Sequence, residues 1–203
     1  IFFNTKDDQL ISKEFRQSLI YAINRSEFDG HPATSPIAAT SWAYNEGVKR
    51  YEYNTGRAKE LLTKSQVPNP KVKLSYNPAL EKIATQVKTD WEAIGVEVEI
   101  INEPQIPIDF QAFLTINKLS PDPDQYGFWH SSQKTSNITH LSDVKIDKLL
   151  EDARATQDEG KRKELYFDFQ RFLVDEAPAA FLYHPYKYKV TYKNIQALSD
   201  KLP

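Results

Sequence analysis

The sequence contains no cysteine and no methionine, and only six of its 203 residues are glycine. The absence of cysteine excludes disulfide bonds, thiol catalysis and metal sites built on thiolates. The chain contains no glycine-rich phosphate loop, no dinucleotide fingerprint and no nucleophile elbow. No apolar stretch approaches the ~18 residues that a membrane-spanning helix needs. These absences remove the sequence signatures of thiol enzymes, nucleotide-binding enzymes and α/β-hydrolases.

Charge is nearly balanced, with 26 Lys and Arg residues against 28 Asp and Glu residues. There is no basic stripe, so we expect no nucleic-acid partner. The four histidines lack the paired spacing of a zinc site, and each is predicted to be a surface or core residue. Hydrophobic residues make up 40% of the chain, which is ample for a core. We therefore expect a globular domain with neither a metal nor a cofactor.

The first half of the chain alternates between helix and strand patterns. Ser12 is a good N-cap for a helix that carries apolar residues from Phe15 to Ile23, and residues 56–62 predict a second, short helix. Residues 72–101 predict a strand, a helix that faces the core with Trp91, and a second strand after Gly95. A strand–helix–strand unit implies parallel strands and a right-handed crossover.

The second half predicts a strand at residues 110–116, a polar and aromatic loop, two amphipathic helices and two short strands around Pro185. Asp158 is the expected N-cap of the second helix, whose Phe169 should be buried. Residues 30–56 are rich in turn formers and predict a long irregular connection. The whole pattern indicates an α/β domain.

The loop "SPDPDQYGFWHSSQ", residues 120–133, is too polar for a core strand and too aromatic for an ordinary surface loop. Asp122 and Asp124 could share acid–base chemistry, but carboxylates on either side of a proline are more typical of turn and helix caps. The aromatic residues on loops could line a ligand cleft or fill the gap between loop and sheet. The sequence leaves these two alternatives open for Trp42, Tyr44, Tyr126, Phe128 and Trp129.

Six segments, in order, resemble the family 5 bacterial extracellular solute-binding proteins, the oligopeptide-, dipeptide- and nickel-binding group. They are "FFNTKDDQLISKEFRQSLIYAINR", "HPATSPI", "YNTGRAKELL", "TQVKTDWEAIGVEVEI", "PDPDQYGFWHSSQ" and the long segment from "KIDKLLEDARA" to "FLYHPYKYKV". Each segment alone is a loose match. Their common order over nearly the whole chain makes the resemblance specific.

This resemblance implies the C-terminal ligand-binding lobe of an extracytoplasmic solute-binding protein, spanning residues 1–203. The fold would be one lobe of a periplasmic-binding-protein type II-like fold, a mixed sheet with flanking helices, with residues 180–203 returning toward the other lobe. The implied function is binding of a solute, an oligopeptide above all, for an ABC-type importer. The implied partners are the ligand, the N-terminal lobe and a membrane permease, and the protein would be a monomer and not an enzyme. The lack of cysteine fits an extracytoplasmic location.

One departure from the family pattern concerns the ligand. Oligopeptide and dipeptide binders of the family place an aspartate three residues before the first DPD position, where it pairs with the peptide α-amino group. Leu119 occupies that position here, and Ile116 stands where the family has a tryptophan. The resemblance therefore implies that a charge-paired amine clamp is missing, unless Asp122 or Asp124 replaces it.

We expect polar ligand contacts from Asn4, Asp122, Asp124, His130 and Asn137, with cleft walls from Trp42, Tyr44, Tyr126 and Trp129. A hydrolase that uses Asp122, Asp124 and His130 is the alternative from another class, although no nucleophile or metal set accompanies these residues. A purely structural domain is the third possibility.

Overall fold

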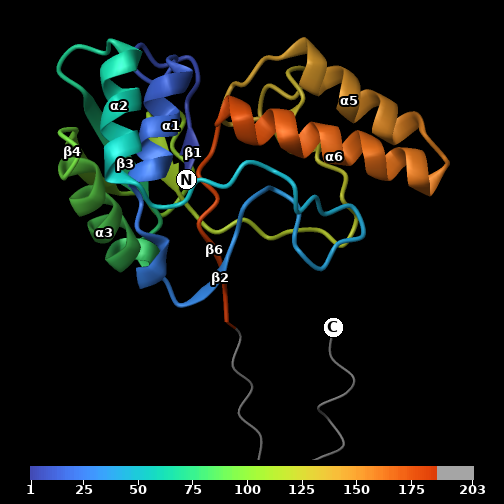
Figure 1. Ribbon diagram of the computed structural model, residues 1–203, viewed down its shortest axis with the longest axis horizontal. Coiled ribbons are helices and arrows are strands. Elements are labelled where there is room, and N and C mark those ends of the chain that lie inside the picture. The colour runs from blue at the N-terminus through green and yellow to red at the C-terminus, as the bar shows by residue number, and fades with distance from the viewer. Residues whose placement is uncertain (187–203) are drawn as a thin grey trace, which may run out of the picture.

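A four-stranded mixed sheet organises the first half of the chain in the computed structural model, which describes residues 1–186 (Figure 1). Its strands, in spatial order, are β1 (Phe2–Phe3), β5 (Ala112–Leu114), β3 (Lys71–Tyr76) and β4 (Glu97–Asn102). β3 is parallel to both of its neighbours, whereas β1 runs antiparallel to β5. The predicted parallel strand–helix–strand unit is therefore confirmed.

Three helices accompany this sheet: α1 (Lys13–Ala22), α2 (Thr55–Ser65) and α3 (Glu81–Glu92). The predicted cap is present, because the Ser12 hydroxyl accepts a hydrogen bond from the Phe15 amide. A 3₁₀ turn, η2 (Pro78–Leu80), precedes α3, and Gly95 follows it with φ of +97°, a conformation that favours glycine. The sequence had indicated the second of these boundaries, at Gly95.

The first core lies between the sheet and these helices. Trp91 of α3 is fully buried, and its indole nitrogen donates to the Leu19 carbonyl of α1 at 2.9 Å. Its ring also lies 6.3 Å from that of Phe3, measured between centroids. The same core continues through Val72 and Leu74 of β3. Burial of these side chains is the main stabilising contribution in this half of the molecule.

A helical hairpin of α5 (Val144–Ala155) and α6 (Glu159–Glu176) builds the second core, together with the short helix α4 (Tyr126–Trp129). The hairpin lies beside the sheet region in Figure 1. Asp143 and Asp158 cap the two long helices through backbone amides, as predicted for Asp158. Phe169 and Tyr166 of α6 are almost completely buried here. The predicted burial of Phe169 is confirmed.

Arg16 joins the two regions. Its guanidinium donates to the carbonyls of Ala177 and Glu176 at the end of α6, at 3.0 and 2.7 Å, and to that of Leu10 at 2.6 Å. A buried guanidinium needs such partners, because an unpaired buried donor is costly. α1 and α6 are thereby fixed to each other.

A two-stranded antiparallel ribbon, β2 (Gly30–Pro32) with β6 (Tyr183–Pro185), lies below the sheet in Figure 1. Gly30 is required here, because a Cβ atom would lie 2.3 Å from the His184 carbonyl oxygen. The connection expected to be irregular from residue 30 therefore begins with a strand. Of the two strands predicted around Pro185, β6 ends at that proline, and the second lies outside the described residues. So does most of the segment expected to return toward another lobe.

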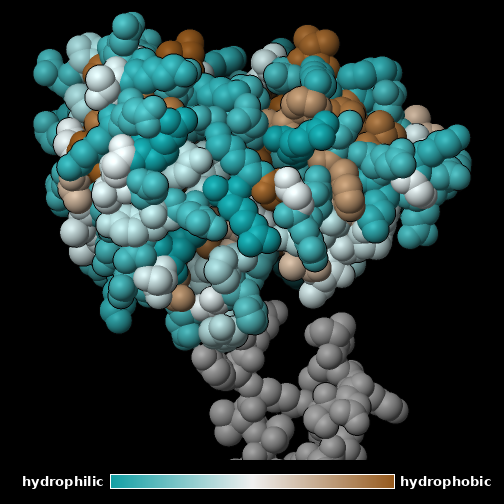
Figure 2. Space-filling view, viewed as in Figure 1, coloured by the Kyte–Doolittle hydropathy of each residue, from teal (hydrophilic) through white to brown (hydrophobic). Residues whose placement is uncertain are grey.

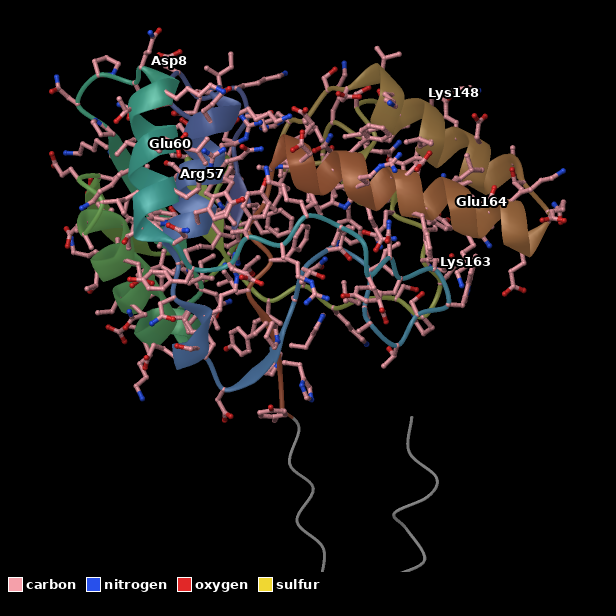
Figure 3. The ribbon with its side chains drawn as sticks, viewed as in Figure 1. Asp8, Arg57, Glu60, Lys148, Lys163 and Glu164 are labelled. Atoms are coloured by element: carbon pink, nitrogen blue, oxygen red, sulfur yellow. The ribbon has the colours of Figure 1, made fainter. Side chains whose placement is uncertain are left out.

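The surface is largely hydrophilic in the view of Figure 2, with a cluster of apolar residues over the helical hairpin. Charged side chains cover the outer faces of α2, α5 and α6, as Figure 3 shows for Arg57, Glu60, Lys148, Lys163 and Glu164. Arg57 and Glu60 form an ion pair of 2.6 Å along α2. Among the described residues, no helix combines the length and apolar character required to cross a lipid bilayer.

Candidate ligand-binding site

A cavity of about 370 Å³ opens where the end of β5, the start of α3 and the segment that leads into β6 meet. Leu80 and Ile83 contribute from η2 and α3, and Trp129 from α4. The chain from residue 179 to residue 185 forms another side. This volume lies within the usual range of small-ligand sites in proteins.

Residues 115–119, which follow β5, contribute to one side of the cavity. Thr115, Ile116, Asn117 and Leu119 all line it. Their backbone amides and carbonyls make no hydrogen bond within residues 1–186. Ile116 is 64% exposed, which is unusual for a large aliphatic side chain beside a cavity. The carboxyl end of a parallel strand is where open α/β sheets bind ligands.

Asp122 and Asp124 shape the loop that had suggested a ligand site. The Asp122 carboxylate accepts from the Asp124 amide at 2.9 Å, and the Asp124 carboxylate accepts from the Tyr126 amide at 3.0 Å. Both are turns in which the side chain binds the amide two residues further on, and the second lies at the start of α4. Asp124 also accepts two hydrogen bonds from Arg154, at 2.8 and 2.6 Å. Neither carboxylate lines the cavity.

The electrostatics of Asp124 follow from this pairing. Partial burial alone would raise the pKa of its carboxyl, but the hydrogen bonds from Arg154 and from the Tyr126 amide, with the charges of Arg154 and Arg162, lower it below its usual range. Asp122 lies 3.3 Å from Arg162, at an exposed position. The loop thus carries negative charge that is already matched by arginines of the helical hairpin.

His130 and Asn137 are buried and hold the same loop together. The Asn137 amide donates to the Leu141 carbonyl at 2.9 Å and, more weakly, to the carbonyls of Trp129 and His130 at 3.4 Å. The His130 ring lies 2.8 Å from the Ser132 hydroxyl through Nδ1 and 3.3 Å from Glu151 through Nε2. The predicted hydrolase set of Asp122, Asp124 and His130 is therefore not assembled: each side chain has a different partner.

The four predicted aromatic walls divide into two groups. Trp129 lines the cavity and is 2% exposed, so it is both a wall and a core residue, and its ring lies 5.9 Å from that of Phe2. Tyr126 stacks on His130 at 4.1 Å, away from the cavity. Trp42 and Tyr44 pack against the second core, where Trp42 meets Tyr166. Packing against the core thus holds for Trp42, Tyr44 and Trp129, and Trp129 also lines the cavity.

Asn4 lies at the end of β1 and bonds within the chain. Its side-chain amide donates to the Phe110 carbonyl at 3.0 Å, and its side-chain oxygen accepts from the Lys6 amide at 3.1 Å. Of the nine predicted ligand contacts, only Trp129 lines the cavity. From the sequence, Thr115 and Asn117 were not predicted as ligand contacts. Ile116 and Leu119 were noted only as departures from the family pattern. The signal that could have found all four is their place at the carboxyl end of a parallel strand.

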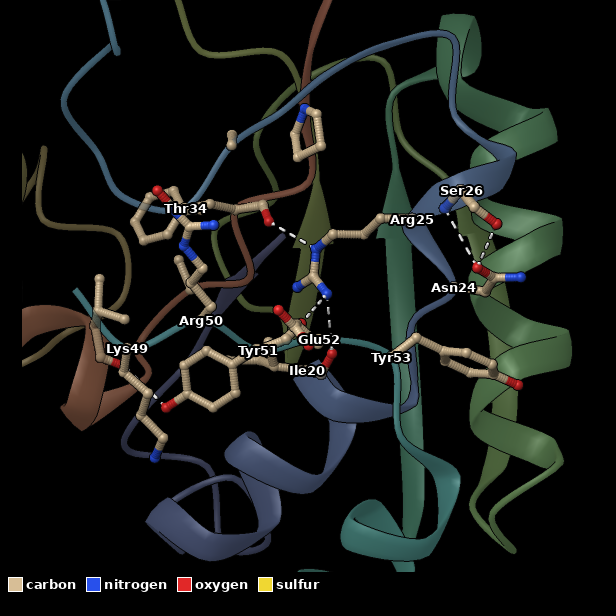
Figure 4. A pocket seen from close by; sticks show the side chains of 15 residues that line it. Ile20, Asn24, Arg25, Ser26, Thr34, Lys49, Arg50, Tyr51, Glu52 and Tyr53 are labelled. Carbon is tan, nitrogen blue, oxygen red and sulfur yellow. Dashed lines mark hydrogen bonds between the residues drawn. The ribbon is translucent and has the colours of Figure 1, made fainter. Parts of the chain in front are cut away.

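A second cavity of about 340 Å³ surrounds Arg25 (Figure 4). The guanidinium donates to the carbonyls of Phe181 at 3.1 Å and Tyr51 at 2.8 Å, which joins three segments of the chain. Burial lowers the pKa of Arg25 to about 10, so it stays charged at neutral pH. The described residues contain no group of three or more His, Cys, Asp or Glu side chains that could hold a metal ion. The first cavity, beside a backbone segment that makes no hydrogen bond within residues 1–186, is the better candidate for a ligand.

Comparison with known proteins agrees with this geometry. Residues 1–138 match the model of the middle part of the bacterial extracellular solute-binding proteins, family 5. The chain belongs to this family. The family is one of solute-binding proteins, and the relatives described below are named for the binding of peptides. The α/β fold with a mixed sheet and flanking helices is the periplasmic-binding-protein fold.

Two family 5 relatives and one solved structure illustrate the likeness. The chain is 28% identical over 234 aligned residues to the oligopeptide-binding protein AppA of Bacillus subtilis, covering 97% of this chain and 43% of that protein. It is 26% identical over 226 residues to the dipeptide-binding protein of Escherichia coli, covering 96% and 41%. The structure of Bacillus subtilis AppA in complex with a nonapeptide superposes with a TM-score of 0.82 at 26% identity, covering 91% and 44%. The chain thus spans about two fifths of these relatives.

Proposed function

We propose that residues 1–203 are the C-terminal ligand-binding lobe of an extracytoplasmic solute-binding protein that delivers oligopeptides to an ABC-type importer. Its partners are then the peptide, the N-terminal lobe of the same protein and a membrane permease, and the protein acts as a monomer. Family membership supports solute binding. The two relatives named for peptides and the nonapeptide complex support peptides as the solute.

The observation that carries the peptide assignment is the backbone of residues 115–119 beside the cavity, which makes no hydrogen bond within the described residues 1–186. A peptide has the same regular series of amides and carbonyls. It can therefore add to this segment as a further strand, with main-chain hydrogen bonds for affinity and side chains in the flanking space. A ligand without a peptide backbone gives no such match.

Main-chain recognition can be tested on the full-length protein that contains this chain. Proline substitutions at Thr115, Ile116 and Asn117, one at a time, remove single amide donors, and alanine at the same positions is the matched control. We expect at least one proline variant to weaken peptide binding about tenfold in calorimetry, since one hydrogen bond contributes about 1.4 kcal/mol. Equal affinities for all proline and alanine pairs would contradict recognition through this segment.

Two further measurements test the wider proposal. Mass spectrometry of the full-length protein as purified should reveal bound peptides. If none is recovered and no added peptide binds, the peptide assignment is contradicted. The isolated chain should bind peptides far more weakly than the full-length protein, because half of a cleft supplies few contacts after the entropy cost of association. Micromolar binding by residues 1–203 alone would contradict the lobe assignment.

One observation keeps the hydrolase alternative testable: Ser132, His130 and Glu151 are linked in series by contacts of 2.8 and 3.3 Å. A serine, a histidine and a carboxylate are the parts of a nucleophilic triad. Ser132, however, lines neither of the two cavities described above, so this series of contacts lies outside the candidate ligand site. Incubation of peptides with the full-length protein should leave them intact by mass spectrometry. Cleavage that Ser132→Ala abolishes would establish the alternative.

A further inference from the structure

We propose that the second cavity, around Arg25, is a binding site for a small organic carboxylate with an apolar body. It is separate from the cavity proposed for the peptide and shares with it only a wall formed by Ala33, Ala179 and Phe181. Three features of the second cavity support the site: an arginine without an acidic partner, a surplus of positive charge, and an apolar wall (Figure 4).

The guanidinium of Arg25 has one donor nitrogen that the fold does not use. Nε donates to the Phe181 carbonyl at 3.1 Å, and Nη1 donates to the carbonyls of Tyr51 at 2.8 Å and Ile20 at 3.4 Å. Nη2 makes no hydrogen bond within the described residues, and Figure 4 shows none around the cavity. Among these residues, Arg162 Nε is the only fully buried side-chain nitrogen or oxygen without a partner, so Arg25 Nη2 is open to the cavity.

Arg25 also lacks a negative charge to balance its own. It forms no ion pair with any carboxylate of residues 1–186, and burial alone accounts for the change in its pKa. The carbonyls around the guanidinium accept hydrogen bonds but carry no net charge. A partly buried cation without a counter-ion gains more from an added carboxylate than a cation that is already paired.

Two further cations line the cavity. Lys49 and Arg50 add positive charge, and Glu52 is the one carboxylate in the lining. Lys49 lies 3.4 Å from Asp175, whereas Arg50 and Glu52 are exposed and form no ion pair with a described residue. Arg25 and Arg50 lie on two sides of the cavity in Figure 4. Cations therefore outnumber carboxylates, and the cavity attracts anions.

Much of the remaining lining is apolar or aromatic. The Tyr51 hydroxyl donates to the Val174 carbonyl at 3.0 Å, which fixes this ring against the end of α6. A ligand with an aliphatic or aromatic body covers this wall and removes apolar surface from water, whereas an inorganic anion leaves it uncovered. The apolar and aromatic side chains are those of Ile20, Pro32, Ala33, Tyr51, Tyr53, Val174, Ala179 and Phe181.

Benzoate is a suitable probe for this site, and benzamide, an uncharged molecule of nearly the same shape, is its matched control. Ligand-observed NMR titrations of the full-length protein at constant ionic strength measure both. We expect saturable binding of benzoate with a dissociation constant on the order of 1 mM, because the molecule is small, and at least tenfold weaker binding of benzamide. Equal affinities, or no saturable binding of benzoate in the millimolar range, would overturn the proposal.

Arg50→Glu shows whether benzoate binds in this cavity. Arg50 is exposed, so the fold should tolerate the change, and the reversed charge should weaken benzoate binding at least tenfold. Lys59→Glu is the matched control, because Lys59 is exposed on α2, forms no ion pair with a described residue and does not line the cavity. It should change the affinity less than twofold. Benzoate bound elsewhere would ignore Arg50→Glu or respond equally to both variants, and either result contradicts the proposal.

Arg25→Gln tests the open donor itself. Glutamine supplies no charge, so benzoate binding should be lost in a variant whose circular dichroism matches that of the parent. Retained binding in such a variant would count against the site. Arg25 also joins three segments of the chain, and if Arg25→Gln does not fold, the comparison of Arg50→Glu with Lys59→Glu decides.

The carboxylate that fits this cavity can come from a free ligand or from an acidic side chain of the same protein outside residues 1–186. The full-length protein distinguishes these sources. An acidic side chain that already occupies the site would exclude benzoate, and a site for a free ligand is then wrong. Saturable binding that depends on Arg50 supports the free ligand.

Discussion

The sheet region and the helical-hairpin region are stabilised by different means. In the sheet region, apolar side chains at regular spacing on β3 and α3 pack into one core, with Trp91 at its centre. In the hairpin region, a comparable helical core is joined to long loops by buried polar side chains, among them His130, Asn137 and Gln170. Regular packing resists change, whereas a loop held by side-chain hydrogen bonds can be reshaped around a ligand by a few substitutions.

This difference explains where the cavity lies. It opens at the junction of the two regions, with Leu80 from one, Trp129 from the other and residues 115–119 as the link between β5 and the loop. The sheet supplies a fixed edge and the hairpin supplies the loop. Functional segments on loops that rest on a rigid scaffold are common in proteins.

The largest expected effect is a loss of stability, and measuring it at one tryptophan of each core compares the two cores directly. Trp91→Ala and Trp129→Ala should each lower the free energy of unfolding by about 3–5 kcal/mol, because both side chains are buried. Trp129 lines the cavity, but its burial predicts a loss as large as that for Trp91. Urea unfolding followed by circular dichroism measures both. A loss below ~1 kcal/mol for Trp129→Ala alone would show that the hairpin region is loosely packed.

A smaller effect should come from the loop itself. Asn137→Ala removes the donor to the Leu141, Trp129 and His130 carbonyls and should cost about 1–3 kcal/mol. Asn117→Ala is the control, since Asn117 is exposed and makes no hydrogen bond within the described residues. Thermal unfolding of the two variants provides the comparison. Equal stabilities would mean that buried polar side chains do not hold this region together.

The smallest effect concerns the ion pair between Asp124 and Arg154. These side chains are partly exposed, so a double-mutant cycle should give a coupling energy of only about 0.2–1 kcal/mol. Because pairing lowers the pKa of Asp124 in the folded state, its stabilising contribution is present above the unfolded pKa and is lost as pH falls through the lower, folded value. Carboxyl NMR titration should show a higher Asp124 pKa in Arg154→Ala. An unchanged pKa would exclude Arg154 as the cause.

Much of the fold could be predicted from the sequence, but little of the site could. Ser12, Asp158 and Gly95 marked helix ends because capping and left-handed backbone depend on the local residue. The pairing of β1 with β5, and of β2 with β6, joins segments more than a hundred residues apart, and short strands carry no sequence signal of their partner. The cavity depends on both pairings, so its lining could not be deduced from local pattern.

The same limit explains the polar residues assigned to a ligand. Asp122, Asp124, His130 and Asn137 were selected by residue type, since polar groups on an aromatic loop suit a binding site. The structure gives each of them a partner within the chain. Which partner a side chain chooses depends on tertiary contacts such as that of Arg154, thirty positions away from Asp124 in the sequence.

The backbone of residues 115–119, which has no hydrogen-bond partner within residues 1–186, has a consequence for aggregation. A segment whose amides and carbonyls have no partner within residues 1–186, beside an exposed isoleucine, is a place where another copy of the same segment can add. Nothing within residues 1–186 blocks it with a proline or a covering strand. Expressed without a covering lobe or a ligand, the chain should self-associate at high concentration through this edge, and a bound peptide would then act as a shield against aggregation as well as cargo.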